Sequence, residues 1–293
     1  MGMKRRVITL FLVLLLFGVT IFAAGQERVT EYFKFDPSRM DVGNMYHYVA
    51  SDLDGKYPMD TYLYVKSPDT IVIYKDYPQI FPDQGLVFIV EIKFNWDYMM
   101  AERLYARNPV NDLTIPKQEI ESIGEIDFTR KVFNIKATVN DQQGKPVTKT
   151  YILEYEREPF YDYSLFHIDL QFALRHLKEG VKKFMVGNTY AAKYGELIIE
   201  YVGEETINGI PCRKYEHRTQ GILAKLLGAW GYIWLAKDDP RHFTVKYASH
   251  LQRNYVWKNF SLELKEIKKM EPEEWEAFVG ELVAEANRFF GMD

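Results

Sequence analysis

Residues 133–157 show the clearest alternation of apolar and polar positions in this chain. In the first half, every second residue is apolar: Phe133, Ile135, Ala137 and Val139. A period of two with one apolar and one polar face is typical of an antiparallel strand with one side in water. A polar turn over 141–146 leads into residues 150–157, where Tyr151, Leu153 and Tyr155 share one face. The two segments therefore predict a β-hairpin.

Similar segments, bounded by turn signals such as Asp54-Gly55 and Asn208-Gly209, predict further strands. They span residues 44–51, 60–66, 70–76, 86–94, 182–186, 195–203, 210–218, 230–236, 241–249 and 253–267. This spacing predicts a mainly β fold, either a curved antiparallel meander or a half-open barrel. We expect residues 26–293 to form one β-rich domain, with a subdivision near residue 160 as the alternative. Residues 98–107 are compatible with either a helix or a strand.

Two segments follow a helical period instead. The first stripe comprises Tyr163, Phe166, Leu170, Leu174 and Leu177, and predicts an internal helix. The second helix is expected to begin at Glu271-Pro272-Glu273-Glu274, since proline and acidic residues are favoured in a first turn. Its stripe comprises Trp275, Phe278, Leu282, Ala286 and Phe289. Each apolar face requires a surface to cover it, and packing inside the same fold is the simplest interpretation.

The N-terminal segment has the pattern of a secretory signal peptide. Lys4–Arg6 precede an apolar run that begins at Val7, and small residues follow at Ala23-Ala24-Gly25. We expect residues 1–25 to be this signal, with cleavage after Gly25 and retention as an N-terminal anchor as the alternative. The predicted location is periplasmic or associated with the cell envelope, for a bacterial source.

Composition limits the partners. The chain of 293 residues has a net charge of −4, which removal of the basic signal residues makes more negative. Such a chain is not expected to bind a nucleic-acid backbone. Its one cysteine, Cys212, excludes an intramolecular disulfide and is expected to be a buried, inert thiol.

Three segments stand out between residues 162 and 269: the segment 166–177, the phrase Gly203–Cys212, and the phrase Ile233–Arg241 with its tryptophan, paired acids and arginine. Through these segments the region resembles a family of exported bacterial proteins of unknown function. This resemblance implies a half-open antiparallel barrel wrapped around a helix, similar to the periplasmic lipoprotein carriers. From the residues themselves, we expect Asp238 or Asp239 to cap a turn and pair with Arg241.

One candidate site is an aromatic sheet face that would form a concave, ligand-binding groove. Its members are Tyr62, Tyr64, Phe133, Ile135, Tyr151, Leu153, Tyr155 and Trp234. The expected ligand is an apolar small molecule or lipid. The same residues would also make an ordinary filled core, and the sequence leaves both interpretations open.

The stronger candidate is the segment 221–230, which is apolar where a hairpin tip is normally polar. Its apolar residues are Ile222, Leu223, Leu226, Leu227 and Trp230. Exposed apolar clusters mark ligand, partner or membrane contacts. The segment is therefore a candidate gate over a barrel mouth or a peripheral membrane loop, while a short helix plugging the barrel is the structural alternative.

Catalytic and metal-binding patterns are missing from the sequence. No serine lies in a G-x-S-x-G elbow, the six histidines show no H-E-x-x-H spacing, and Asp52–Gly55 lacks the glutamate that closes a calcium loop. We expect no cofactor, no metal and no catalytic residue.

Three functions remain. The leading hypothesis is an exported, non-enzymatic binding or carrier protein that holds an apolar ligand in a curved sheet. The second is an envelope assembly factor that docks a protein partner through its C-terminal helix. The third is an extracytoplasmic hydrolase, which no spacing supports.

Overall fold

The structure is a computed structural model. It describes residues 32–36, 39–56, 58–76, 87–96, 100–107, 119–127, 132–140, 145–154, 160–162, 172–188, 193–220, 230–250 and 260–289. The signal segment lies outside these ranges.

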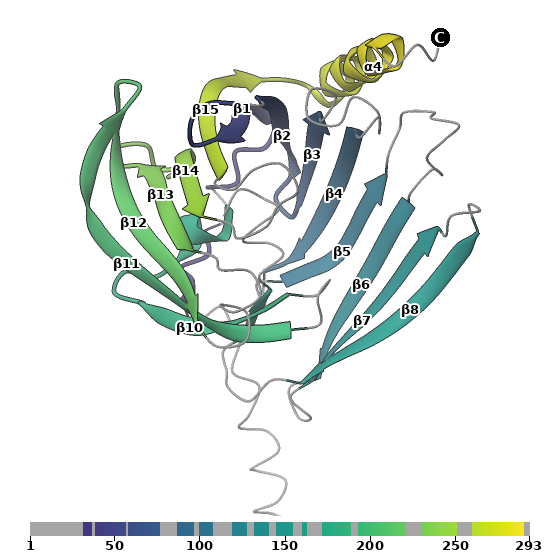
Figure 1. The fold of residues 1–293 in the computed structure, drawn as a ribbon, viewed down its shortest axis with the longest axis horizontal. Helices are drawn as coiled ribbons and strands as arrows, with labels where there is room; N and C mark the ends of the chain where they lie inside the picture. The colour runs from purple at the N-terminus through teal and green to yellow at the C-terminus, as the bar shows by residue number, and fades with distance from the viewer. Residues whose placement is uncertain are drawn as a thin grey trace, which may run out of the picture.

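The described chain contains fifteen strands, a 3₁₀ helix and an α-helix (Figure 1). The first eight strands are β1 (Asn44–Asp52), β2 (Met59–Ser67), β3 (Thr70–Asp76), β4 (Val87–Asn95), β5 (Met100–Arg107), β6 (Glu119–Asp127), β7 (Val132–Asn140) and β8 (Pro146–Glu154). The later strands are β9 (Phe160–Asp162), β10 (Lys183–Asn188), β11 (Lys193–Ile207), β12 (Ile210–Gln220), β13 (Trp230–Ala236), β14 (Thr244–His250) and β15 (Phe260–Lys269). The helices are η3 (Phe172–His176) and α4 (Pro272–Phe289).

All fifteen strands belong to one sheet, in the order β8-β7-β6-β5-β4-β3-β2-β1-β15-β14-β13-β12-β11-β10-β9. Neighbouring strands are antiparallel except for the parallel pair β9 and β10. The first and last strands therefore pair in the middle of the sheet, with Asn44 opposite Lys269 and Asp52 opposite Phe260. Figure 1 shows the sheet bending so that β4–β8 and β10–β13 form two walls. The predicted mainly β, curved antiparallel fold is confirmed.

Two of the predicted turns explain where the chain reverses direction between neighbouring strands. Asn208 and Gly209 both have positive φ, 50° and 81°, and Ile207 pairs with Ile210 across them. These are the conformations that a two-residue hairpin turn requires. At the β13–β14 turn, the Asp239 carboxylate accepts hydrogen bonds from both the backbone and the guanidinium of Arg241. The expected aspartate–arginine pair is confirmed at Asp239.

The predicted internal helix is shorter and different in kind where it is described. Residues 163–171 lie outside the described ranges, and residues 172–176 form a 3₁₀ turn instead of an α-helix. Leu177 makes a β-bridge with Phe33, and the Lys178 backbone N–H donates to the carbonyl of Tyr32 at 2.8 Å. These contacts draw the backbone out of the helical path, because its hydrogen-bonding groups are used by the N-terminal segment.

Alternate residues of the strands pack on opposite faces of the sheet. On one, the inner face, Leu63 is buried in a large cluster with Phe33 and Leu174. On the other, the α4 face, Tyr64 belongs to a second cluster with Trp275. This separation follows from the two-residue period of a strand.

Helix α4 begins as its sequence predicts. Pro272 occupies the first turn, and the Glu274 carboxylate accepts a hydrogen bond from the Glu271 backbone N–H at 2.8 Å, as in a capping box. Trp275 then stacks on Tyr64 with ring centroids 5.0 Å apart, and Phe278 meets Tyr62 edge-on. Among the described residues, no helix has both the length and the apolar character needed to cross a membrane.

Candidate binding cavity

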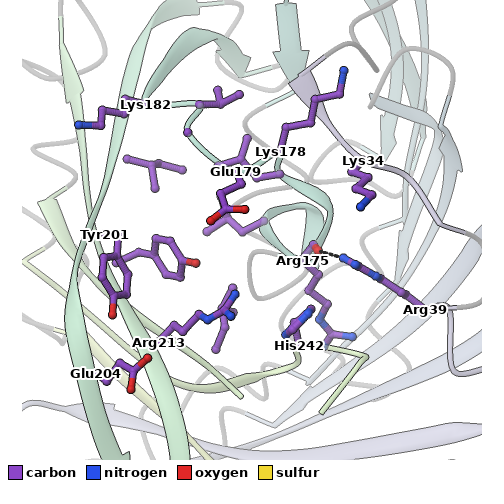
Figure 2. A pocket seen from close by; sticks show the side chains of 17 residues that line it. Lys34, Arg39, Arg175, Lys178, Glu179, Lys182, Tyr201, Glu204, Arg213 and His242 are labelled. Atoms are coloured by element: carbon purple, nitrogen blue, oxygen red, sulfur yellow. Dashed lines mark hydrogen bonds between the residues drawn. The ribbon is translucent and has the colours of Figure 1, made fainter. Parts of the chain in front are cut away.

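A cavity of about 500 Å³ lies on the inner side of the sheet, between the segment that contains η3 and strands β11 and β12 (Figure 2). Its apolar lining comprises Leu174, Leu177, Val181, Ile199 and Leu235. Tyr201 and Tyr215 add two aromatic rings, 5.8 Å apart and edge-on. The cavity therefore combines apolar walls with phenol groups at its edge.

The floor of the cavity rests on a buried ionic network. The Asp41 carboxylate lies 3.9 Å from Arg175 Nη1 and 3.6 Å from Arg241 Nη1, and it accepts a hydrogen bond from the Tyr46 hydroxyl. The Arg175 side chain is 1% exposed, and its guanidinium lies over the Tyr46 ring. A buried charge is tolerated only when it is paired, so Asp41 is the group that keeps Arg175 in place.

Arg39 is held at the cavity wall through the same network. Its Nη1 donates to the Arg175 carbonyl oxygen at 2.9 Å, as the dashed line in Figure 2 shows. Its Nε lies 3.9 Å from the Asp36 carboxylate, which is beyond hydrogen-bonding distance. Arg39 is thus oriented by a backbone carbonyl and retains other N–H donors.

Basic side chains dominate the polar lining. They are Lys34, Arg39, Arg175, Lys178, Lys182 and Arg213, against the two acidic residues Glu179 and Glu204. Glu204 is already paired with Lys237, whose ammonium lies 2.7 Å from its carboxylate. The cavity is therefore electropositive in a protein of net negative charge.

His176 lies beside this network and is fully buried. Burial, together with the nearby charges of Arg175 and Arg39, lowers the pKa of His176 to about 3. Its ring is surrounded by Phe35 and Trp96, with centroids 5.3 and 5.6 Å away. His176 is therefore neutral near pH 7 and adds no charge to the cavity.

Tyr215 remains a neutral hydrogen-bonding group. Burial raises the pKa of its phenol, which outweighs the lowering effect of the neighbouring Arg213. A neutral phenol can both donate and accept a hydrogen bond. Tyr215 can therefore serve as a donor to a ligand oxygen.

The aromatic groove residues predicted from the sequence are not brought together where they are described. Tyr62 and Tyr64 lie on the α4 face, where α4 covers them. Trp234 lies on β13 among charged residues, and its Nε1 donates to Glu205 at 2.8 Å. None of the three lines the cavity. Five members have no described side chains, so their placement in a groove stays a prediction: Phe133, Ile135, Tyr151, Leu153 and Tyr155.

The candidate gate lies mostly outside the described residues. Ile222, Leu223, Leu226 and Leu227 fall there. Trp230, at the start of β13, is 36% exposed, and its Nε1 lies 3.2 Å from the Glu216 carboxylate. The gate stays a prediction.

Metal-ligating groups do not gather within the described ranges, where no three or more His, Cys, Asp or Glu side chains lie in position to hold an ion. Cys212 is buried, and burial raises the pKa of its thiol. This fits the expected inert thiol.

Sequence reasoning missed the cavity residues. Lys34, Asp41, Arg175 and Arg213 are far apart along the chain and carry no shared motif. The one local signal is the basic, glycine-containing run from Lys178 to Lys183. That run would have indicated an exposed cationic loop without identifying its partners across the cavity.

Comparisons with known proteins report a distant structural neighbour. No family model matches the chain, and no curated protein matches it. Among solved structures, a DUF1329 family protein from Desulfovibrio piger is 9% identical, with 80% of this chain and 88% of that chain covered and a TM-score of 0.29. A likeness at that TM-score carries no inference about activity, and the resemblance to lipoprotein carriers stays a prediction.

Proposed function

We propose that this protein is an exported, non-enzymatic binding or carrier protein of the cell envelope that holds a ligand with an apolar part in the inner cavity. The observation that carries the proposal is the cavity itself, about 500 Å³ in volume and walled by five aliphatic side chains beside two tyrosines. Small-molecule sites are concave, about 300–1,000 Å³ in volume, and mostly apolar with a few placed polar groups. Its lining fits a bound amphiphile better than a fully polar solute.

Ligand recovery tests the proposal directly. The protein is purified from envelope fractions and analysed by native mass spectrometry, and the delipidated protein is then titrated with a fluorescent fatty acid. We expect a co-purifying amphiphile and saturable binding of the probe. Recovery of no ligand together with no probe binding would contradict the proposal.

A cavity-filling variant locates the binding. Val181 lines the cavity and is partly buried, so Val181→Trp should occupy the ligand volume and weaken probe binding at least about tenfold. Ile152→Trp on β8 is the matched control, because Ile152 is 59% exposed and does not line the cavity. Equal loss of binding in both variants, or in neither, would place the site elsewhere.

Export belongs to the same proposal and rests on the N-terminal sequence pattern. Residues 1–30 are fused to an alkaline phosphatase that lacks its own signal and is active only outside the cytoplasm. We expect activity from this fusion, and loss of activity when Leu14→Arg interrupts the apolar run. Activity that does not respond to the Leu14 change would contradict a signal function.

Partner docking through the C-terminal helix is the weaker alternative. Trp275 and Ala286 of its apolar stripe are buried against the sheet, and Phe278 and Leu282 pack around them. The stripe is thus used inside the chain, so the structure offers no observation that favours this function.

A further inference from the structure

We propose that the cavity selects ligands with an anionic head group, a carboxylate or phosphate ester, which Arg213 binds together with Arg39 and Lys34. This inference rests on the proposed binding function and names the ligand class. Its starting point is that Lys34, Arg39 and Arg213 line one partly apolar cavity, in which Glu204 is already paired with Lys237.

Arg213 is the central cation of this group. It lies on β12, opposite Glu204 of β11 and Leu235 of β13. Figure 2 shows its guanidinium pointing toward the middle of the cavity, whereas the ammonium groups of Lys178 and Lys182 point away from it. Within the described ranges, no carboxylate lies within 4.0 Å of Arg213. Its charge is therefore not neutralised by a described acidic side chain.

Arg39 and Lys34 approach from the other side of the cavity. Arg39 is already oriented by the Arg175 carbonyl, so fixing it on a ligand costs little conformational entropy. Lys34 is exposed, and its backbone N–H donates to the His176 carbonyl, which positions the residue at the rim. A guanidinium presents a planar fork of donors that matches a carboxylate or phosphate, and a concave wall of one charge sign concentrates anions.

The adjacent apolar wall distinguishes an amphiphile from a free inorganic anion. Leu235 lies directly opposite Arg213 in the sheet, and Ile199 and Val181 line the same cavity. A ligand that places its anionic head at Arg213 can therefore lay its chain along these side chains. Free phosphate would use only the charged half of the cavity.

Glu179 provides a second way to test the proposal. Figure 2 shows its carboxylate pointing into the cavity, where it opposes an incoming anion. Replacing it with glutamine removes that repulsion without changing the size of the side chain.

Isothermal titration with four probes tests the proposal: laurate, dodecyl phosphate, 1-dodecanol and inorganic phosphate, all below their aggregation limits. We expect laurate and dodecyl phosphate to bind at least about tenfold more tightly than dodecanol, the usual scale of a hydrogen bond to a charged group. Arg213→Gln should remove that preference, and Glu179→Gln should increase it. Arg218→Gln, on the same strand but paired with Glu216 and Glu200, is the matched control.

The outcomes separate the two proposals. Equal binding of laurate and dodecanol, unchanged by Arg213→Gln, would overturn the anion preference and leave the binding function intact. Binding of none of the probes would overturn both. If inorganic phosphate binds as tightly as dodecyl phosphate, the proposal that the ligand is an amphiphile would be overturned, and the cavity would be a simple anion site. Thermal unfolding of each variant confirms that the fold is retained, as expected for the exposed Arg213.

Discussion

The surface under α4 and the inner cavity lie on opposite faces of the same sheet. They differ in how tightly their side chains fill the space and in the kind of side chain that lines them. Under α4, rings from both sides meet: Trp275 stacks on Tyr64, and Phe278 meets Tyr62. At the cavity, aliphatic side chains such as Leu235 lie beside guanidinium groups and leave about 500 Å³ open. The chain thus fills the space under α4 with its own aromatic side chains, whereas it leaves an open volume at the cavity.

Different forces stabilise the two faces. Apolar stacking stabilises the α4 face, whereas the cavity floor depends on the buried charges of Asp41 and Arg175. The stability lost when an apolar side chain is removed from a packed face scales with the size of that side chain. Removing one partner of a buried ion pair instead leaves the other charge uncompensated. Variants on the two faces should therefore respond differently to pH and to ligand.

The largest expected effect is on the packed face. Trp275→Ala removes a buried ring and should lower the free energy of unfolding by about 4 kcal/mol, measured by urea titration. Phe289→Ala, on the same helix but 59% exposed, is the control and should change it by less than about 1 kcal/mol. Equal effects of the two variants would show that α4 does not seal its face through Trp275.

The cavity floor should respond to loss of a single charge. Asp41→Asn keeps the side-chain shape but leaves Arg175 without its counter-charge, and should lower the free energy of unfolding by about 3 kcal/mol. Asp36→Asn is the control, since Asp36 is about half exposed and lies 3.9 Å from Arg39. That change should cost less than about 1 kcal/mol. A small effect of Asp41→Asn would mean that the network contributes little.

Mild acid should weaken the cavity side through His176. The unfolded chain binds a proton at His176 near pH 6.5, whereas the folded protein does so only near the lowered pKa of about 3. Acidification therefore favours unfolding, and stability should fall by about 2 kcal/mol between pH 7 and pH 5.

Urea titrations at the two pH values measure this change, above the range in which most carboxylates titrate. His176→Phe keeps a ring beside Phe35 and Trp96 and should flatten the dependence. A slope that persists in His176→Phe would assign the effect to another group.

The smallest expected effect is an increase in stability from a change in α4. Gly280 lies inside α4, and a methyl group there would meet open space, so Gly280→Ala should stabilise by about 0.5–1 kcal/mol. Gly231→Ala is the opposite case: the added Cβ would clash with the Ala248 carbonyl oxygen, so this change should destabilise the protein. Thermal melting of both variants checks the difference in sign, and two changes of the same sign would contradict it.

Local sequence patterns predict most of the fold. The β7–β8 hairpin follows from clean alternation, the β11–β12 hairpin from Asn208-Gly209, and α4 from Pro272 and its apolar stripe. β6 was missed because Ser122 and Gly124 interrupt the apolar positions on one of its faces. β9, with three residues, is too short to show a period.

Local sequence patterns could not predict the cavity, for a different reason. Its ionic floor joins Arg175 and Arg241 to Asp41, and only the tertiary fold brings each guanidinium within 4 Å of that carboxylate. Likewise, Tyr64 and Trp234 read alike in the sequence as apolar strand residues. The structure places one beneath a helix and the other beside Glu205, a difference set by elements distant in the chain.

The pairing of β1 with β15 has a consequence for how the protein is made. The two strands are neighbours at the centre of the sheet, yet β1 is the first and β15 the last of the described strands along the chain. A nascent chain therefore holds two unfinished half-sheets, each with an unpaired edge, until its final strand is available. Native folding of the sheet is delayed until β15 has been synthesised, which leaves an interval for chaperones to keep the edges apart.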